Sequence, residues 1–207
     1  AGFSSMEITK AVNDFSLPSG FTELEGLLFP AQYSFAKGTS AQEALQSMVD
    51  RALRELTKSG VVGSSTKYTS QQLLIMASII QAEGNTLDFA KISRVIRNRL
   101  EKGMPLQMDS TVHYVKGTRG SVFLSTNSTL IKSPYNTYRN YGLPPGPIGN
   151  PGESALQAAL SPTQGDWLYF ITVAPGDTRF TTTLTEFNEW KVLYKSNLRA
   201  GKFGDGK

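Results

Sequence analysis

Residues 73–80 form the stretch that most constrains the fold, because they combine helical spacing with side chains that are almost all apolar. A helix that is apolar on almost every side is typical of a buried position. A single carboxylate, Glu83, follows three residues later. The residues three, four, seven and eight positions before it are all large and apolar: Ile80, Ile79, Met76 and Ile75. The acid is therefore expected on the same helix face as these side chains.

This position predicts a raised pKa for the carboxyl of Glu83. Burial among apolar side chains favours the protonated form, and the backbone carbonyls of a last helical turn oppose a negative charge. A glutamate that keeps its proton near neutral pH can act as a general acid. The alternative is a solvated glutamate, or one paired with a nearby cation, for which the candidates are Lys91, Arg94, Arg97 and Arg99.

Composition limits the classes of protein that this chain can represent. Its 207 residues fit one large domain, or a catalytic domain with a small appendage. The absence of cysteine excludes disulfides and thiol chemistry, and the single histidine argues against a histidine-rich metal site. Net charge is +4, but the basic residues are scattered, so nucleic-acid binding is not expected. The longest apolar run is too short to span a bilayer.

Capping patterns divide the first half of the chain into helices. Thr39 or Ser40 precedes a 3.6-residue apolar period over residues 44–53. Residues 69–72 form a capping box that opens the apolar helix. Asp88 is expected to start an amphipathic helix. Its expected inward residues are Phe89, Ile92, Val95, Ile96 and Leu100, and its expected outward residues are Lys91, Arg94, Asn98 and Glu101.

The second half of the chain is predicted to contain long ordered loops, over residues 103–150. Pro151 predicts the first position of a helix. Residues 167–173 and 179–181 predict two strands joined by a turn, and a capping box at 183–186 predicts a C-terminal helix. The expected fold class is α+β, with a mainly helical core and a small antiparallel sheet.

Several segments between Leu24 and Trp190 form an ordered set of motifs. They are Leu24–Gly26 with Phe29–Pro30, Ala77–Ile80 with Glu83, Asn98–Leu100, Gly103–Val112, Ser133–Tyr138, Gly142–Ile148 with Asn150–Gly152, and Leu168–Phe170. As a set they resemble the catalytic domain of the YceG-like family of endolytic murein transglycosylases, also called MltG. Any one fragment is a weak signal, whereas the ordered set is highly specific.

The resemblance implies a lytic transglycosylase that cuts peptidoglycan strands between N-acetylmuramic acid and N-acetylglucosamine and leaves 1,6-anhydro ends. The catalytic glutamate of the family corresponds to Glu83. Family members often carry a second glutamate two residues earlier, where this chain has Gln81. The usual Asp-Pro after Gln107 is replaced by Asp109-Ser110.

Other roles are also implied by the resemblance. The expected substrate-binding residues are Gln107, Asn136, Tyr138, Tyr135 and Asp109. The expected supporting residues are Glu25, Ser133 and Thr137. Amide side chains suit sugars because they both donate and accept hydrogen bonds. No metal or other cofactor is expected. Residues 1–20 are predicted to be the tail of a LysM-like module or an edge element, and residues 21–207 the catalytic domain.

The cellular setting is likewise an expectation from the resemblance. The substrate is peptidoglycan, and cell-wall synthesis enzymes are candidate partners. A single membrane tether is expected in the full-length bacterial protein, and not in this chain. The expected location is the extracytoplasmic face of the cell membrane.

Two other functions are compatible with the same residues. One is a hydrolytic muramidase, which needs a second carboxylate, with Asp109 or Asp88 as candidates. The other is a glycan-binding scaffold without catalysis. A lytic transglycosylase needs fewer protein groups than a hydrolase because the C6 hydroxyl of the sugar is the nucleophile.

Overall fold

The computed structural model describes residues 2–118 and 124–203. In those residues it contains seven α-helices, one 3-10 helix and one two-stranded antiparallel sheet, which confirms the α+β class. Over the same ranges, no helix is long and apolar enough to cross a membrane. The elements are α1 (Ser5–Asn13), α2 (Ala41–Lys58), α3 (Ser70–Glu83), α4 (Phe89–Glu101), α5 (Asp109–Lys116), η1 (Thr126–Leu130), α6 (Glu153–Leu160), β1 (Tyr169–Ala174), β2 (Asp177–Thr181) and α7 (Leu184–Arg199).

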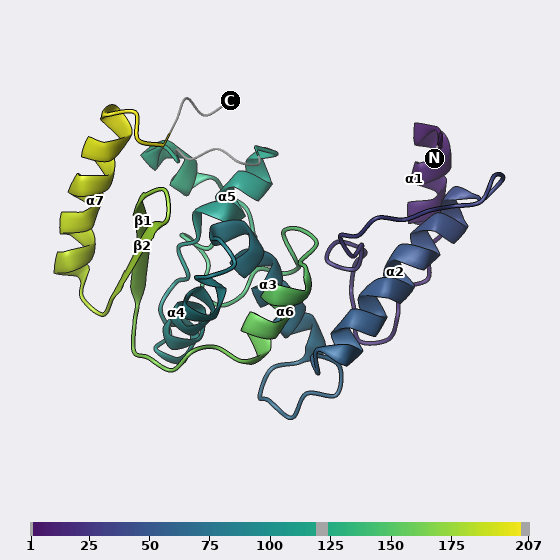
Figure 1. Cartoon of the computed structure of the whole chain (residues 1–207), viewed down its shortest axis with the longest axis horizontal. Coiled ribbons are helices and arrows are strands. Elements are labelled where there is room, and N and C mark those ends of the chain that lie inside the picture. The colour runs from purple at the N-terminus through teal and green to yellow at the C-terminus, as the bar shows by residue number, and fades with distance from the viewer. Residues whose placement is uncertain (1, 119–123, 204–207) are drawn as a thin grey trace.

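Three groups of elements follow one another across the molecule (Figure 1). Helices α1 and α2 lie together at one side, α3 to α6 form the centre, and the β1–β2 hairpin packs against α7 at the other side. The central group is held around α3, which contacts α4, α5 and α6.

Helix α3 lies in the middle of the hydrophobic core, as its apolar pattern predicts. Every residue from Leu73 to Ile80 is buried. Thr69 caps the helix in the predicted capping box with Gln72, and the helix ends at Glu83 before Gly84. Burial of each large apolar side chain here stabilises the fold by about 1.5–3 kcal/mol. The last turn of α3 therefore follows directly on a fully buried segment, residues 73–80.

Helix α4 starts after Asp88 as predicted, but the expected outward position of Asn98 is wrong. Asn98 is buried because its amide donates to the carbonyl oxygens of Gly165 and Trp167, at 3.1 and 2.9 Å. Arg97 is also buried, and its guanidinium donates to Ala159. These polar side chains bind the backbone of segments more than 60 residues away, which a helical period does not reveal.

The stretch 103–150 holds more regular structure than expected, since α5 and η1 lie within it. Helix α5 has only eight residues and no side-chain cap from Met108, so the usual start signals are missing. Helix α6 begins at Glu153, two residues after the predicted start at Pro151. Outside α5 and η1, the described residues of this stretch form loops, and Leu106, Met108 and Ile148 belong to the hydrophobic core.

The hairpin and the last helix lie close to their predicted bounds. Strands β1 and β2 pair antiparallel, with Phe170 opposite Phe180, and the two rings stack at 5.7 Å. Thr183 caps α7, as predicted. The buried amide of Asn197 donates to the carbonyl oxygen of Val173 at 2.8 Å and ties α7 to β1.

Helix α1 lies within the residues expected to be a tail or an edge element, and a capping box between Ser4 and Glu7 starts it. It packs against α2. The division into a preceding module and a catalytic domain at residue 20 stays a prediction, and the last four residues of the predicted domain lie outside the described residues.

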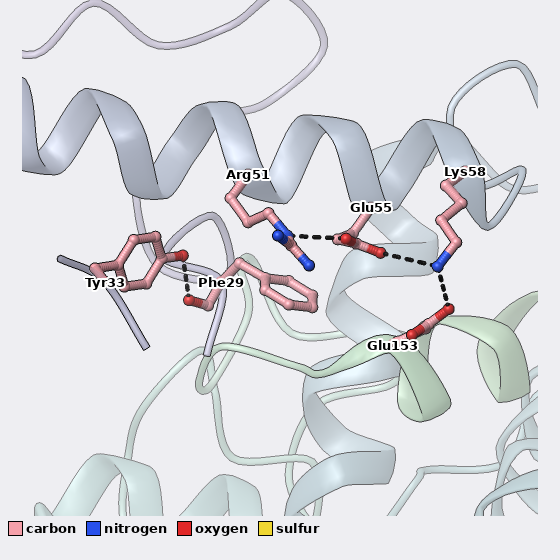
Figure 2. Close-up of polar contacts among 6 residues, drawn as sticks. All are labelled: Phe29, Tyr33, Arg51, Glu55, Lys58 and Glu153. Atoms are coloured by element: carbon pink, nitrogen blue, oxygen red, sulfur yellow. Dashed lines mark hydrogen bonds and ion pairs between the residues drawn. The ribbon is translucent and has the colours of Figure 1, made fainter. Parts of the chain in front are cut away.

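Helix α2 joins the centre of the molecule through the ion pairs drawn in Figure 2. Nε of Arg51 lies 2.9 Å from Oε1 of Glu55, and Nζ of Lys58 lies 3.8 Å from Oε2 of the same glutamate. Lys58 also reaches Glu153 at the start of α6, at 2.8 Å. The Arg51 guanidinium lies over the ring of Phe29. Glu55 is buried, and its charge is matched by cations on its own helix.

Candidate active site

The carboxyl of Glu83 lies between two helix ends. It ends α3, and its Oε1 accepts a hydrogen bond from the backbone N–H of Ser110 at 2.9 Å, in the first turn of α5. The carbonyls at the end of α3 oppose a negative charge, whereas the free N–H groups at the start of α5 favour one. The residue is half-buried. One carboxyl oxygen is thus fixed by the protein.

The pKa of Glu83 is raised from its ordinary value near 4.5 to about 7. Burial is the largest cause, because the charged form loses hydration, and the charge of Asp109 adds to the rise. The hydroxyl and backbone N–H of Ser110 lower the pKa and so limit the shift. At neutral pH a large share of the molecules therefore carries a protonated Glu83, as the helix pattern predicts.

None of the four cations considered as partners binds Glu83 in the described residues. The ammonium of Lys91 lies over the rings of Trp167 and Phe180. Arg94 donates to the carbonyl oxygen of Thr163 at 2.7 Å, and Arg97 donates to carbonyls of α6. Arg99 donates to the carbonyl oxygens of Leu168, Pro105 and Leu106. The ion-paired alternative for Glu83 is therefore wrong.

Asp109 and Tyr138 form a second polar pair beside Glu83. The hydroxyl of Tyr138 donates to Oδ1 of Asp109. Burial, and then the charges of Asp109 and Glu83, raise the pKa of Tyr138 well above its ordinary value near 10. The phenol therefore stays protonated and keeps donating at any physiological pH. The two predicted residues are brought together near the acid.

Gln107 has an unusual backbone. Its φ is 52°, and it is the one non-glycine residue of the described chain with a positive φ. Such strained positions cluster at functional sites. Its side chain is exposed, with Oε1 3.2 Å from Nη1 of Arg99. Its backbone N–H donates to the carbonyl oxygen of Thr137 at 3.0 Å. The side chain therefore remains accessible, and its role in substrate binding stays a prediction.

Thr137 joins the loop that carries it to residues 107 and 108. It is buried, and its Oγ1 accepts from the backbone N–H of Met108 at 2.9 Å and lies 3.0 Å from Oγ1 of Thr111. Residues 107 and 108 are thereby held directly before α5. These contacts agree with the predicted supporting role of Thr137, which acts on Gln107 and on the start of α5.

Asn136 and Ser133 organise the turn that carries Tyr138. The Asn136 amide is fully buried, donates to Thr129 and Ile131, and accepts from the backbone N–H of Tyr138. All of its polar atoms are thus engaged within the loop, so these contacts do not favour sugar binding, which stays a prediction. Oγ of Ser133 accepts from the backbone N–H of Tyr135 at 3.2 Å, which is a supporting contact.

Tyr135 packs against Tyr114 of α5. Its ring contacts that of Tyr114 at 5.0 Å. A side chain at Gly146 would collide with Oε1 of Glu23 and the hydroxyl of Tyr135, so the glycine lets the proline-rich turn lie against both. Burial, and then the charge of Glu25, raise the pKa of Glu23. Glu25 is half-buried, and its predicted supporting role stays a prediction.

Two polar side chains of α3 bind the proline-rich loop, residues 142–152. Oγ of Ser78 accepts from the backbone N–H of Ile148 at 3.0 Å, and Oε1 of Gln81 accepts from that of Gly152 at 3.1 Å. Ser78 and Gln81 therefore bind backbone N–H groups of the segment between α5 and α6, and Glu83 binds one in the first turn of α5. A glutamate at position 81 could accept the same hydrogen bond from Gly152. This contact therefore does not explain why the chain has Gln81 where relatives often have a glutamate.

A hollow of about 440 Å³ lies at residues 132–140, the segment that includes Asn136 and Tyr138. Its lining is Lys132, Ser133, Pro134, Arg139 and Asn140. In the described residues, no group of three or more His, Cys, Asp and Glu side chains is placed to hold a metal ion.

Ser110 and Glu23 are the two site residues that sequence reasoning missed. The sequence has Asp109-Ser110 where the family usually has Asp-Pro. This difference could have indicated a backbone hydrogen bond from residue 110, because proline has no N–H to donate. Glu23 gave no signal, since its contact with Tyr135 and Gly146 joins segments more than 100 residues apart.

Comparison with known proteins gives a consistent picture. The sequence model of the YceG-like family matches residues 2–192. The chain is 42% identical over 176 residues to a protein of Bacillus subtilis (strain 168) named endolytic murein transglycosylase, covering 84% of this chain and 49% of that relative. It is 34% identical over 179 residues to a protein of the same name from Streptococcus pneumoniae serotype 2 (strain D39), covering 84% of this chain and 30% of the relative.

A solved structure is also similar. The crystal structure of a yceG-like protein from Listeria monocytogenes matches with a TM-score of 0.73 and 34% identity, over 89% of this chain and 64% of that chain. This chain spans at most about half the length of the two transglycosylases.

Proposed function

This chain belongs to the YceG-like family, and on that basis we propose that it is the catalytic part of an endolytic peptidoglycan lytic transglycosylase. The observation that carries the proposal is the carboxyl of Glu83, with a pKa of about 7 and no ion-pair partner in the described residues. Relatives named endolytic murein transglycosylase support the choice of peptidoglycan as substrate.

In the first step Glu83 acts as a general acid. It donates its proton to the oxygen that links C1 of N-acetylmuramic acid to N-acetylglucosamine, and the C1–O bond breaks. The leaving sugar departs with a new hydroxyl group. A pKa near the working pH suits this step, because the acid is both protonated and able to release its proton.

In the second step the ionised Glu83 acts as a base. The C6 hydroxyl of the muramic acid attacks C1, and its proton passes to the carboxylate as the 1,6-anhydro ring closes. No water is consumed, and Glu83 returns to its starting protonated form. One carboxyl group thus serves both steps.

Neighbouring side chains orient the substrate in this proposal. The exposed amide of Gln107 binds a sugar hydroxyl or the acetamido group, and Tyr138, held by Asp109, lies beside the acid. Tyr135 offers a ring face for stacking on a sugar. The roles of Asn136, Ser133 and Thr137 are to hold these residues in place.

The product decides between this reaction and hydrolysis. Purified glycan strands are digested with the protein, and the fragments are weighed by mass spectrometry. Anhydro ends are lighter by one water than reducing ends. Anhydro ends that are lost with Glu83→Gln support the proposal, whereas exclusively reducing ends would establish a muramidase with Asp109 or Asp88 as second acid. Binding of strands without any cleavage would favour the scaffold function.

The cellular setting belongs to the proposal as well. A peptidoglycan substrate requires the active site to face the wall, on the extracytoplasmic side of the bacterial membrane. Cell-wall synthesis enzymes are the partners we propose, since cutting new strands sets their length. A full-length protein with a membrane tether is tested by fractionation of cells, in which recovery only in the cytosolic fraction would contradict this location.

A further inference from the structure

Ser110 is the residue that touches Glu83 most directly. Its backbone N–H donates to Oε1 at 2.9 Å. It is the second residue of α5, where helical N–H groups have no partner within the helix. Met108, at the cap position, makes no side-chain cap bond. The carboxyl of Glu83 therefore takes the place of a cap for α5, and α5 fixes the carboxyl in return.

The hydroxyl of Ser110 is in an unusual state. Its oxygen is buried and has no hydrogen-bond partner in the described residues. A buried hydroxyl without a partner is unfavourable, because it has lost its hydrogen bonds to water. It lies close enough to the Glu83 carboxyl to stabilise the charged form. A serine hydroxyl can rotate its hydrogen to suit the charge of its neighbour.

We propose that Ser110 is a positioning residue that holds Oε1 of Glu83 through its N–H, leaves Oε2 as the atom that carries the proton, and donates its hydroxyl to the carboxylate once that proton is delivered. This inference rests on the proposed function for its catalytic meaning. The geometry itself does not depend on the reaction.

The Ser110 hydroxyl has a different role beside protonated Glu83 than beside ionised Glu83. While Glu83 is protonated, Oε2 points its proton at the glycosidic oxygen, and the Ser110 hydroxyl is unpaired. After proton transfer the carboxylate carries a full charge in a half-buried site, and a second donor from Ser110 stabilises it. Ser110 therefore limits the energy of the base form and lets one residue alternate between the two roles.

Other charged groups near Glu83 do not supply this stabilisation. Asp109 on α5 is an acid whose charge raises the pKa of Glu83, and Tyr138 directs its hydroxyl to Asp109. On α4, the four cations bind elsewhere: Lys91, Arg94, Arg97 and Arg99. On α6, Glu153 pairs with Lys58. Ser110 is thus the one residue of the described chain whose hydrogen bonds favour the ionised Glu83.

The test measures the pKa of Glu83 directly by NMR titration of the chain labelled with ¹³C at glutamate carboxyls, with Glu83→Gln to assign the signal. Ser110→Ala removes the hydroxyl and keeps the N–H, and we expect the pKa to rise by about half to one pH unit. Ser110→Pro removes both donors within the first helical turn, where proline is tolerated, and we expect a rise of about one to two pH units.

Activity provides a second readout. The alkaline limb of kcat/KM should move upward by the same amounts, because the active acid stays protonated to higher pH. Ser93→Ala is the matched control, since Ser93 also has a buried hydroxyl without a partner but lies on α4. It should leave the pKa of Glu83 unchanged.

Failure of this inference differs from failure of the proposed function. If the wild-type chain cleaves no glycan, the function fails, but the NMR titration still decides the role of Ser110. An unchanged pKa in Ser110→Ala and Ser110→Pro, or the same shift in Ser93→Ala, would overturn the inference. If circular dichroism shows that Ser110→Pro is unfolded, the result for Ser110→Ala decides alone.

Discussion

Glu55 on α2 and Glu83 at the end of α3 are both placed against the interior, yet their surroundings differ. Glu55 is 7% exposed and lies between the cations Arg51 and Lys58, as Figure 2 shows. Within the described residues Glu83 has no cation as a partner, accepts one backbone N–H, and lies near the negative charge of Asp109. A carboxylate matched by cations stabilises a fold, whereas one left without them is held in a protonated state that chemistry can use.

The two regions also differ in how they are held. The Glu55 ion pairs join α2 to α6 through Lys58 and lie at the edge of the core. Glu83 ends helix α3, whose residues Leu73 to Ile80 are all buried. Ser78, Gln81 and Glu83 on this helix bind backbone N–H groups of Ile148, Gly152 and Ser110. Rigid support of this kind is what a site needs to keep a proton donor aligned.

The largest expected effect is on catalysis. Glu83→Gln keeps the size of the side chain and an oxygen for the Ser110 N–H, but it removes the proton donor. We expect cleavage of glycan strands to fall by about 10³-fold, within the range of general acid–base catalysis. Release of muropeptides from purified peptidoglycan measures the rate.

Glu55→Gln is the matched control for that loss, and it should cut at a rate close to that of the wild type. Equal losses in the two variants would show that the rate reports folding alone, and a Glu83→Gln variant with normal activity would remove Glu83 as the acid.

Replacing each of the two glutamates by glutamine should change the free energy of unfolding in opposite directions. The folded pKa of Glu83, about 7, is higher than its ordinary value near 4.5. The folded state therefore binds the proton more tightly, and stability falls as pH rises from about 4.5 to 7. Glu83→Gln removes this loss, so we expect it to be more stable by about 2–3 kcal/mol above pH 7 and equal to the wild type below pH 4.5.

Glu55→Gln breaks a matched ion pair, and we expect it to lower stability by about 1–2 kcal/mol at neutral pH. Urea unfolding at several pH values measures both variants. A Glu83→Gln variant that is less stable than the wild type at pH 8 would mean that the ionised carboxylate is well satisfied, and the contrast between the two glutamates would fail.

A smaller effect is expected from the neighbour of the acid. The charge of Asp109 raises the pKa of Glu83, so Asp109→Asn should lower that pKa. We expect the alkaline limb of kcat/KM to move down by about half to one pH unit, because a nearby charge of this kind shifts a pKa by that order. Activity at pH 8 should fall by up to about tenfold.

The same variant tests the hydrolytic alternative. A muramidase that uses Asp109 as nucleophile or base would lose its activity at every pH, with no displaced limb. A simple displacement of the pH profile, with product ends unchanged, would keep Asp109 as a residue that acts through Glu83 and Tyr138.

The part of this contrast that could be predicted is the part encoded locally. The face of Glu83 follows from the spacing of Met76, Ile79 and Ile80 within one helix, and capping residues such as Thr69 mark where that helix begins. The ordered motifs that resemble the YceG-like family led to the same glutamate. Local periodicity and motif order therefore both predict Glu83 as the catalytic acid.

The part that could not be predicted depends on contacts between distant segments. Helix α5 has no cap residue of its own, because the carboxyl of Glu83, 27 residues earlier, takes that place. Asn98 turns inward because the carbonyls of Gly165 and Trp167 need donors. Each such partner is set by tertiary packing, and a single sequence carries no period or spacing that reveals it.

Lys58→Ala should give the smallest effect of the series. The ammonium of Lys58 reaches Glu153 at 2.8 Å and Glu55 at 3.8 Å, but its side chain is 65% exposed. Exposed pairs are weakened by water and salt, so we expect a small fall in melting temperature that disappears in 1 M salt, about the concentration at which the Debye length is near 3 Å. Arg51→Met should cost more, because Arg51 is bound to Glu55 at 2.9 Å and also covers the ring of Phe29. Thermal unfolding at low and high salt measures both variants. A larger loss of stability in Lys58→Ala than in Arg51→Met, at both salt concentrations, would contradict this expectation. The charge of Glu55 would then be balanced mainly by the exposed Lys58. The contrast with Glu83 would in that case depend on one exposed lysine and not on the packing of α2.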